Sequence, residues 1–160
     1  MQLASFLDAR ILFVEPHPKT REEIYSEMVS RICKINPLPV CGAKLVDLVL
    51  ERDRESSTAY PTGLAIPHVR MEGLNDTILS ICILQHPIDY DGTPISMIVL
   101  IITDKSASRI YLNIVAALLK ASKDPEVVAQ IRTCRDGHEL LSTIKKLEIR
   151  VKENLSIQDI

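Results

Sequence analysis

The sequence predicts one α/β domain with a three-layer architecture, in which helices cover both faces of a largely buried sheet. Two observations support this fold class. Apolar, β-branched segments are interspersed with segments whose apolar residues recur at helical spacing. In addition, the segment 94–103 (PISMIVLIIT) is apolar almost without interruption, which is typical of a strand buried on both faces. Such a strand requires a layer of helices on each side of the sheet.

Length and composition exclude several classes of protein. The 160 residues suffice for one core, and 46% hydrophobic with 25% charged residues is a usual globular balance. A net charge of −2 and only 4% aromatic residues do not favour nucleic-acid binding. The longest apolar run, 95–103, is about half the length of a membrane span. No signal-like segment opens the chain, so we expect a cytoplasmic protein without membrane insertion.

The first two elements are a strand and a capped helix. Residues 10–15 (RILFVE) form a short apolar run that ends at a proline, which predicts a strand. Thr20 and Glu23 then make a capping-box pattern, in which each can satisfy a free N–H group of the other. Apolar residues follow at helical spacing, so we expect a helix over residues 20–35.

A second helix and two strands come next. The sequence Asn-Pro-Leu-Pro at 36–39 breaks the first helix, and apolar periodicity predicts another helix over 43–53. The segments 77–84 and 94–103 are rich in β-branched residues and predict two strands. Asp-Tyr-Asp-Gly at 89–92 supplies the turn chemistry between them.

The C-terminal part of the chain predicts three helices. The first covers 111–121, the second begins after Asp124 with Pro125 at its first helical position and runs to Arg132, and the third covers 137–146. The remaining tail is expected to fray or to extend the last helix. The predicted inward-facing side chains of the first of these helices are Leu112, Val115, Ala116 and Leu119.

Metal, nucleotide and hydrolase sites have no support in the sequence. The four cysteines form no Cys-x-x-Cys pair, which favours reduced thiols over a disulfide framework or a zinc knuckle. Histidines are too far apart for a zinc site, and neither a Gly-rich phosphate loop nor a Gly-x-Ser-x-Gly elbow occurs. We therefore expect no metal and no cofactor. The cysteines are Cys33, Cys41, Cys82 and Cys134.

One histidine has an unusual setting, in TGLAIPHVR at 62–70. A short apolar segment and Pro67 precede His68, so a stiff backbone is expected to deliver the imidazole to the surface. Arg52, Arg54 and Arg70 are candidate neighbours, and guanidinium groups beside an imidazole suit the transfer of a phosphoryl group. On the residues alone, an ordinary structural histidine and a phosphate-handling nucleophile both stay open. The other histidines, at 17, 86 and 138, read as exposed loop or helix-start residues.

The surroundings of His68 resemble a known family, the IIA domains of the bacterial phosphoenolpyruvate-dependent phosphotransferase system of the fructose/mannitol/nitrogen-regulatory class. Its members carry a helix that ends in Arg-Glu, a Ser/Thr-rich stretch and then Gly-Ile-Ala-Ile-Pro-His. This chain has the same spacing. The resemblance covers residues 8–147 of a single domain over 1–160, and leaves 148–160 as a tail. The matching segments are Glu51-Arg52-Asp53, Ser57–Thr62 and Gly63–His68.

The resemblance implies a mixed central sheet and a phosphoryl acceptor at His68. The donor would be the phosphocarrier HPr or its nitrogen-branch relative, and Arg52 would stabilise the phosphoryl group. Thr58, Gly63 and Arg70 would line the site. The next partner would be a IIB domain or a regulatory target protein, and transfer needs neither metal nor nucleotide.

Two departures from the family keep an alternative open. Many members have a second histidine where this chain has Tyr111, and family glycines are replaced by Ala59 and Pro61. We therefore weigh a phosphocarrier, acting in sugar uptake or in nitrogen regulation, against a binding module that has lost phosphotransfer. Retention of Arg52 and His68 favours the phosphocarrier, and the lack of an attached IIB or IIC segment slightly favours regulation. The sequence leaves a dimer open.

Overall fold

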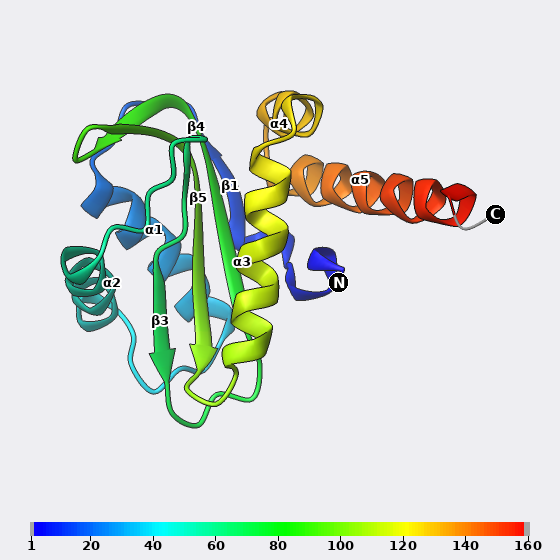
Figure 1. The fold of residues 1–160 in the computed structure, drawn as a ribbon. Helices are drawn as coiled ribbons and strands as arrows, with labels where there is room; N and C mark the ends of the chain where they lie inside the picture. The colour runs from blue at the N-terminus through cyan, green and yellow to red at the C-terminus, as the bar shows by residue number, and fades with distance from the viewer. Residues whose placement is uncertain (1, 159–160) are drawn as a thin grey trace.

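A mixed five-stranded sheet forms the centre of the computed structural model, which describes the backbone of residues 2–158 and the side chains of residues 2–148 (Figure 1). The strand order is β1-β4-β5-β2, and β3 pairs with β5 beside β2. β4 and β5 are antiparallel, whereas the other pairs are parallel. The strands are β1 (Leu12–Glu15), β2 (Leu64–Ala65), β3 (His68–Met71), β4 (Ile78–Tyr90) and β5 (Thr93–Asp104).

Helices cover both faces of this sheet, as predicted (Figure 1). α1 and α2 contribute to a core on one face, and α3, α4 and α5 contribute to a core on the other. Two 3₁₀ turns, η1 and η2, precede β1. The helical elements are η1 (Leu3–Phe6), η2 (Ala9–Ile11), α1 (Arg21–Ile35), α2 (Ala43–Glu55), α3 (Ser108–Ser122), α4 (Pro125–Arg132) and α5 (Gly137–Gln158).

β5 lies between the two cores and explains the long apolar run of the sequence. Leu100 and Ile102 point into the core beneath α1 and α2, whereas Val99 and Ile101 point into the core beneath α3, α4 and α5. All four side chains are fully buried. Because successive side chains of a strand point to opposite faces, only a strand covered on both sides can be apolar at every position.

Local signals fix the starts of α1 and α4, and both predictions are confirmed. Thr20 Oγ1 accepts a hydrogen bond from Glu23 N (3.2 Å), and Glu23 Oε1 accepts one from Thr20 N (3.3 Å). The Asp124 side chain caps α4 by accepting hydrogen bonds from Glu126 N and Val127 N, with Pro125 at the first turn. Such caps satisfy N–H groups that a helix leaves free, so neighbouring residues alone define them.

The β4–β5 hairpin is longer than the sequence predicts. β4 continues to Tyr90 through an irregularity in pairing between Ile83 and Ile88. The two-residue turn has positive φ at both positions, 51° at Asp91 and 101° at Gly92. Asp-Gly is favoured in such turns because both residues tolerate this conformation.

The predicted inner face of α3 is wrong in part. Leu112 is 62% exposed, and Ala116 is exposed as well. Ile114 and Leu118 are the buried residues, and they lie four positions apart on one row of the helix. Leu112 lies about 200° around the helix from Ile114. Apolar side chains occupy most of the circumference of α3, so helical periodicity alone does not identify the buried side.

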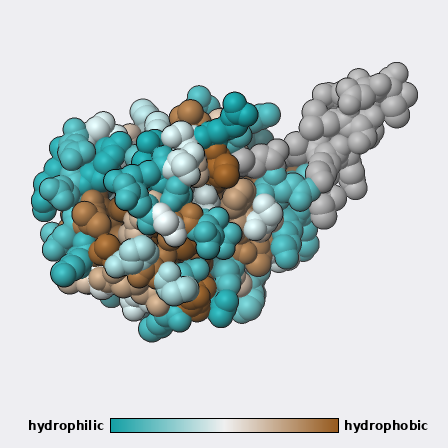
Figure 2. All heavy atoms as spheres, turned by 90° about the horizontal axis from the view of Figure 1, so that it is seen from below, coloured by the Kyte–Doolittle hydropathy of each residue, from teal (hydrophilic) through white to brown (hydrophobic). Residues whose placement is uncertain are grey.

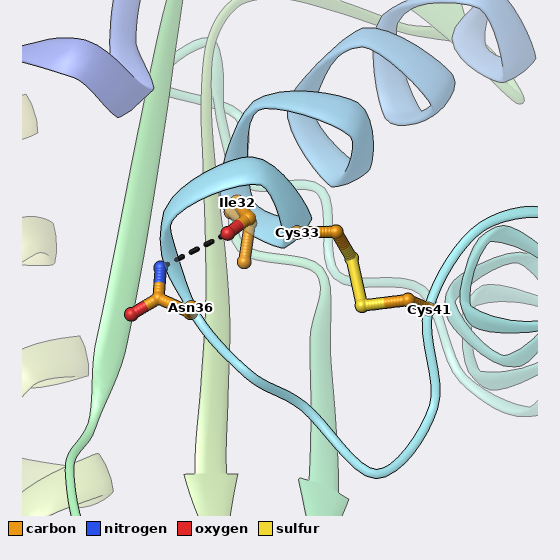
Figure 3. The surroundings of a disulfide bond; sticks show 4 residues. All are labelled: Ile32, Cys33, Asn36 and Cys41. Carbon is orange, nitrogen blue, oxygen red and sulfur yellow. Dashed lines mark hydrogen bonds between the residues drawn. A yellow bond between two sulfur atoms is a disulfide. The ribbon is translucent and has the colours of Figure 1, made fainter.

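The prediction that all cysteines are reduced thiols is also corrected. Cys33, near the end of α1, forms a disulfide with Cys41 in the α1–α2 loop, with a Cα–Cα distance of 6.0 Å (Figure 3). Asn36 begins this loop and donates a hydrogen bond from Nδ2 to the carbonyl of Ile32 (3.0 Å). The chain thus turns back on itself and brings the two cysteines together. The spacing of the cysteines in the sequence alone does not predict this contact. Cys82 and Cys134 are free and buried.

α5 is longer than its predicted span. It extends the expected helix 137–146 to Gln158, and the last two residues of the predicted tail lie outside the described part of the chain. Its first residue is a tightly packed glycine: a Cβ at Gly137 would lie 2.1 Å from the carbonyl oxygen of Leu12. The first turn of α5 is therefore pressed against the backbone of β1.

Candidate functional site

The outer strand of the sheet is split, and His68 lies at the break. β2 and β3 pair one after the other with the same edge of β5, and Ile66 and Pro67 separate them. His68 opens β3 opposite Ile101. Because side chains alternate along a strand, His68 and Arg70 share one face of β3, while Val69 belongs to the core on the other face.

The segment before His68 is closed on itself. Tyr60 N donates to Leu64 O (2.8 Å), and Ile66 N donates to Thr58 O (2.9 Å). Gly63 sits at the turn with φ of 94°, and its carbonyl accepts two backbone N–H groups of β5. These bonds hold the approach to β3 firmly against the sheet. The expected stiffness is present, but its source is hydrogen bonding as well as proline.

The imidazole of His68 is buried, with 8% of the residue exposed, and is not delivered to the surface as predicted. Nδ1 lies 3.4 Å from the carbonyl oxygen of Ile66 and 3.2 Å from Tyr111 Oη. The Tyr111 ring lies beside it, with 4.7 Å between ring centroids. A carbonyl oxygen only accepts, so this contact favours a proton on Nδ1. Among the described residues, none hydrogen-bonds to Nε2, which keeps its lone pair.

Burial lowers the pKa of His68 from its usual value. The Ile66 carbonyl raises it, the charges of Arg52 and Arg70 lower it, and Asp53 raises it slightly, so the net direction is downward. The neutral imidazole is therefore the main form near neutral pH. Only that form has a nitrogen lone pair available for attack.

His68 shares a surface cavity of about 440 Å³ with two guanidinium groups. Arg52 reaches it from the C-terminal end of α2, where its Nη1 also donates to Ser56 O (3.2 Å). Arg70 reaches it from β3 and lies over the ring of Tyr111, with Cζ 5.5 Å from the ring centroid. The lining residues are Leu48, Glu51, Arg52, Glu55, His68, Val69 and Arg70.

The residues predicted from the sequence thus fall into two groups. The structure brings His68, Arg52 and Arg70 into one cavity and sets Tyr111 against the imidazole. Thr58 and Gly63 do not line the cavity, and they act on the segment that leads to His68. Thr58 is buried, and its hydroxyl donates to Asp53 Oδ1 (3.0 Å).

Sequence reasoning missed three lining residues of α2. Leu48, Glu51 and Glu55 follow one another at spacings of three and four positions, and Arg52 lies four positions after Leu48 and three before Glu55. That spacing places them on one side of a helix, so the position of Arg52 was a usable signal. Asp53 has a buried carboxylate. The sequence indicated it only as part of the Glu51-Arg52-Asp53 segment and predicted no further role for it.

A larger cavity, about 640 Å³, lies at the end of the sheet where β3 and β5 stop. Figure 2 shows this end of the molecule, where apolar side chains gather among hydrophilic ones. Asp8, Asp76 and Asp104 line the cavity, and no Lys, Arg or His does. Three carboxylates without a cation do not suit an anionic phosphoryl group. The smaller cavity at His68 therefore fits phosphate chemistry better.

Within residues 2–158, no helix is both long and apolar enough to cross a membrane. Nor does that part contain three His, Cys, Asp or Glu side chains grouped so that they could hold a metal ion.

Comparison with known proteins identifies the family. Residues 5–147 match the family described as phosphoenolpyruvate-dependent sugar phosphotransferase system, EIIA 2. A nitrogen regulatory protein of Bradyrhizobium diazoefficiens is 26% identical over 61% of this chain and 66% of its own length. One of Escherichia coli is 24% identical over 92% of both chains. The crystal structure of nitrogen regulatory protein IIA-Ntr from Neisseria meningitidis has a TM-score of 0.75 at 17% identity, over 89% of this chain and 98% of that one. The match over most of the chain, the mixed sheet and the helices on both faces agree, and the chain belongs to the EIIA type 2 family of the phosphotransferase system.

Proposed function

We propose that this protein is a histidine phosphocarrier that accepts a phosphoryl group on Nε2 of His68. The observation that carries the proposal is the arrangement of the imidazole. Its Nδ1 faces the Ile66 carbonyl and the Tyr111 hydroxyl, and its other nitrogen has no hydrogen-bond partner among the described residues, in a cavity that Arg52 and Arg70 also line. A neutral imidazole held in one tautomer is a competent nucleophile toward phosphorus.

The transfer needs no group beyond the two imidazoles and the cations. The Nε2 lone pair of His68 attacks phosphorus, and the P–N bond to the donor imidazole breaks as the new bond forms. The electron pair of the broken bond returns to the donor nitrogen, while the Nδ1 proton of His68 stays in place. Arg52 and Arg70 offset the negative charge of the phosphoryl oxygens during the transfer.

The donor we propose is HPr or an HPr-like phosphocarrier, and the next partner is a IIB domain or a regulatory target. Both relatives described above are named nitrogen regulatory proteins, which supports regulation over sugar transport for this chain. Phosphorylation would then add negative charge between Arg52 and Arg70, and so change how the surface around His68 binds a target.

Incubation with phosphoenolpyruvate, enzyme I and HPr tests the proposal. We expect intact mass to show one added phosphoryl group that is lost in acid, and peptide mapping to place it on His68. His68→Gln should abolish the modification, while His86→Gln, which changes an exposed histidine, should retain it. Failure of the wild-type protein to react, while another IIA domain reacts in the same tube, would support the non-catalytic binding module instead.

A further inference from the structure

A buried hydrogen-bonded chain lies directly behind the cavity of His68. The carboxylate of Asp53 is its centre, with only 3% of that side chain exposed. Asp53 Oδ1 accepts from Thr58 Oγ1 (3.0 Å), and Oδ2 accepts from the hydroxyl of Tyr25. The Tyr25 oxygen in turn accepts from the hydroxyl of Tyr90 (2.7 Å). Helix α1, helix α2, strand β4 and the loop before β2 thus meet at one carboxylate.

The tyrosine hydroxyls of this chain are fixed hydrogen-bond donors. Burial raises the pKa of Tyr25 and of Tyr90 well above the usual value of a phenol, so both hydroxyls keep their protons. Arg21 lies 3.8 Å from Asp53 Oδ2, and its guanidinium also covers the ring of Tyr90 at 3.7 Å. Thr58, Tyr25 and Arg21 therefore contact the carboxylate directly, and Tyr90 supports it through Tyr25.

Asp53 is linked to His68 along two routes. The Thr58 hydroxyl donates to Asp53, and the Thr58 carbonyl accepts from Ile66 N (2.9 Å), two residues before the imidazole. Ile66 then supplies the carbonyl that faces Nδ1. In addition, the negative charge of Asp53 raises the pKa of His68, in opposition to the lowering by burial and by two arginines.

From this geometry we infer that Asp53, acting through Thr58, is the positioning residue of the phosphoryl-acceptor site. It holds the 58–66 segment in the place from which the Ile66 carbonyl selects the Nδ1–H tautomer of His68. The inference rests on the proposed function for its catalytic meaning, but the tautomer and the titration of His68 can be measured without any phosphoryl donor.

The experiment compares five variants with the wild-type protein. Asp53→Asn removes the charge, and Asp53→Glu keeps it. Thr58→Val removes the hydroxyl that reaches the carboxylate, and Thr58→Ser keeps it. Tyr90→Phe is the structural control, because it removes a buried hydrogen bond of the same chain that touches neither Asp53 nor Thr58. Urea unfolding establishes which variants are folded under the assay conditions.

Side-chain nitrogen NMR measures the tautomer and the pKa of His68. If Asp53 and Thr58 contributed only to stability, neither quantity would change in a folded variant. We expect Asp53→Asn to lower the pKa of His68 further, and Thr58→Val to reduce the fraction of the Nδ1–H tautomer. Phosphorylation by HPr should slow about tenfold in both, mainly in kcat, since a displaced nucleophile is costly even when the donor still binds. Asp53→Glu and Thr58→Ser should recover the wild-type tautomer, and Tyr90→Phe should keep it despite lower stability.

Two outcomes would overturn the inference. One is a folded Asp53→Asn and a folded Thr58→Val that both keep the wild-type tautomer and titration of His68. The other is a Tyr90→Phe variant that changes His68 as strongly as they do, because the effect would then follow from stability alone. If the wild-type protein accepts no phosphoryl group while the NMR changes occur as expected, the proposed function fails and the positioning role of Asp53 stands.

Discussion

The imidazole of His68 is buried beside two guanidinium groups, which makes its protonation costly in the folded protein. Its pKa is lowered mainly by burial, whereas in the unfolded chain it returns to about 6.5. Below that pH the unfolded state binds more protons at this residue than the folded state. The free energy of unfolding therefore falls as the pH drops through about 6.5, until the folded pKa is reached.

Comparison of wild-type protein with His68→Gln measures this contribution. Urea unfolding between about pH 7.5 and pH 5 should show a larger loss of stability for the wild-type protein, because the variant has no imidazole to protonate at this position. The three other histidines are common to both proteins and cancel in the difference. Parallel pH profiles would show that His68 is not harder to protonate in the folded state.

Arg52 is the charge partner whose loss should be most damaging to transfer. It comes from α2, shares the cavity with His68, and is held by Ser56 O. We expect Arg52→Ala to slow phosphorylation by about 100-fold, the usual scale for removing a donor that stabilises charge in the transition state. Arg54→Ala removes an exposed arginine two residues away that does not line the cavity, and it should react at nearly the wild-type rate. Equal rates for the two variants would remove Arg52 from the mechanism.

The family resemblance implies that Tyr111 stands where many members have a second histidine, and in this structure it supplies a hydroxyl beside Nδ1 of His68. Tyr111→Phe keeps the ring contact with His68 and removes the oxygen that lies 3.2 Å from Nδ1. Loss of one hydrogen bond of about 1 kcal/mol should slow transfer about fivefold. Tyr111→His restores the family residue and should raise the rate if this position serves the transfer. Stopped-flow measurement with phosphorylated HPr tests both, and unchanged rates would make the position neutral.

At the scale of elements, α1 is joined covalently to the loop just before α2. The Cys33–Cys41 disulfide closes a short loop, and by the chain-entropy estimate such a link stabilises the folded state by about 2–3 kcal/mol. We expect the double variant Cys33→Ser/Cys41→Ser to lose roughly that amount in urea unfolding. Cys82→Ala is the control for a buried free thiol elsewhere.

A thiol reductant gives a second test of the Cys33–Cys41 disulfide. Addition of a thiol reductant should destabilise the wild-type protein and leave the double variant unchanged, since only the wild-type protein has a bond to reduce. A thiol count on the unfolded, unreduced chain should give two free cysteines, because Cys82 and Cys134 are unpaired. Four free thiols, or equal stability with and without reductant, would contradict the bond.

Elements defined by neighbouring residues were predictable, and those defined by distant ones were not. Thr20, Glu23 and Asp124 lie within one turn of the N–H groups that they cap, so the sequence contains the whole interaction. The buried side of α3 depends instead on where the sheet lies, and Leu112 was assigned to the wrong side for that reason. Strand β3 is only four residues long and was not predicted, because its partner β5 is about thirty residues away in the chain.

The whole molecule has two hydrophobic cores that share β4 and β5, and its cooperativity should depend on those two strands. Leu100 and Ile101 are fully buried, lie in opposite cores, and pair with β4; Ile101 also faces β3. Amide hydrogen exchange at these positions should require global unfolding and be the slowest in the protein. If α3 and its core opened together at a clearly lower free energy, the two faces would unfold separately.

The candidate site shows the same limit of sequence reasoning at the scale of the molecule. Its members come from α2, β3 and α3, and residue types alone left His68 either structural or nucleophilic. The family resemblance selected His68, Arg52 and Tyr111. It did not show that Thr58 faces Asp53 and not the cavity, because that depends on packing between α2 and the loop before β2.

The split outer strand that positions His68 also shapes the open border of the sheet. A continuous border offers a row of free N–H and C=O groups on which another chain can build a further strand. Here that row is interrupted at Pro67, which has no N–H, and Arg70 places a charge on the four-residue piece that follows. The border is therefore a poor template for backbone-mediated aggregation, and its side chains remain free to contact other molecules.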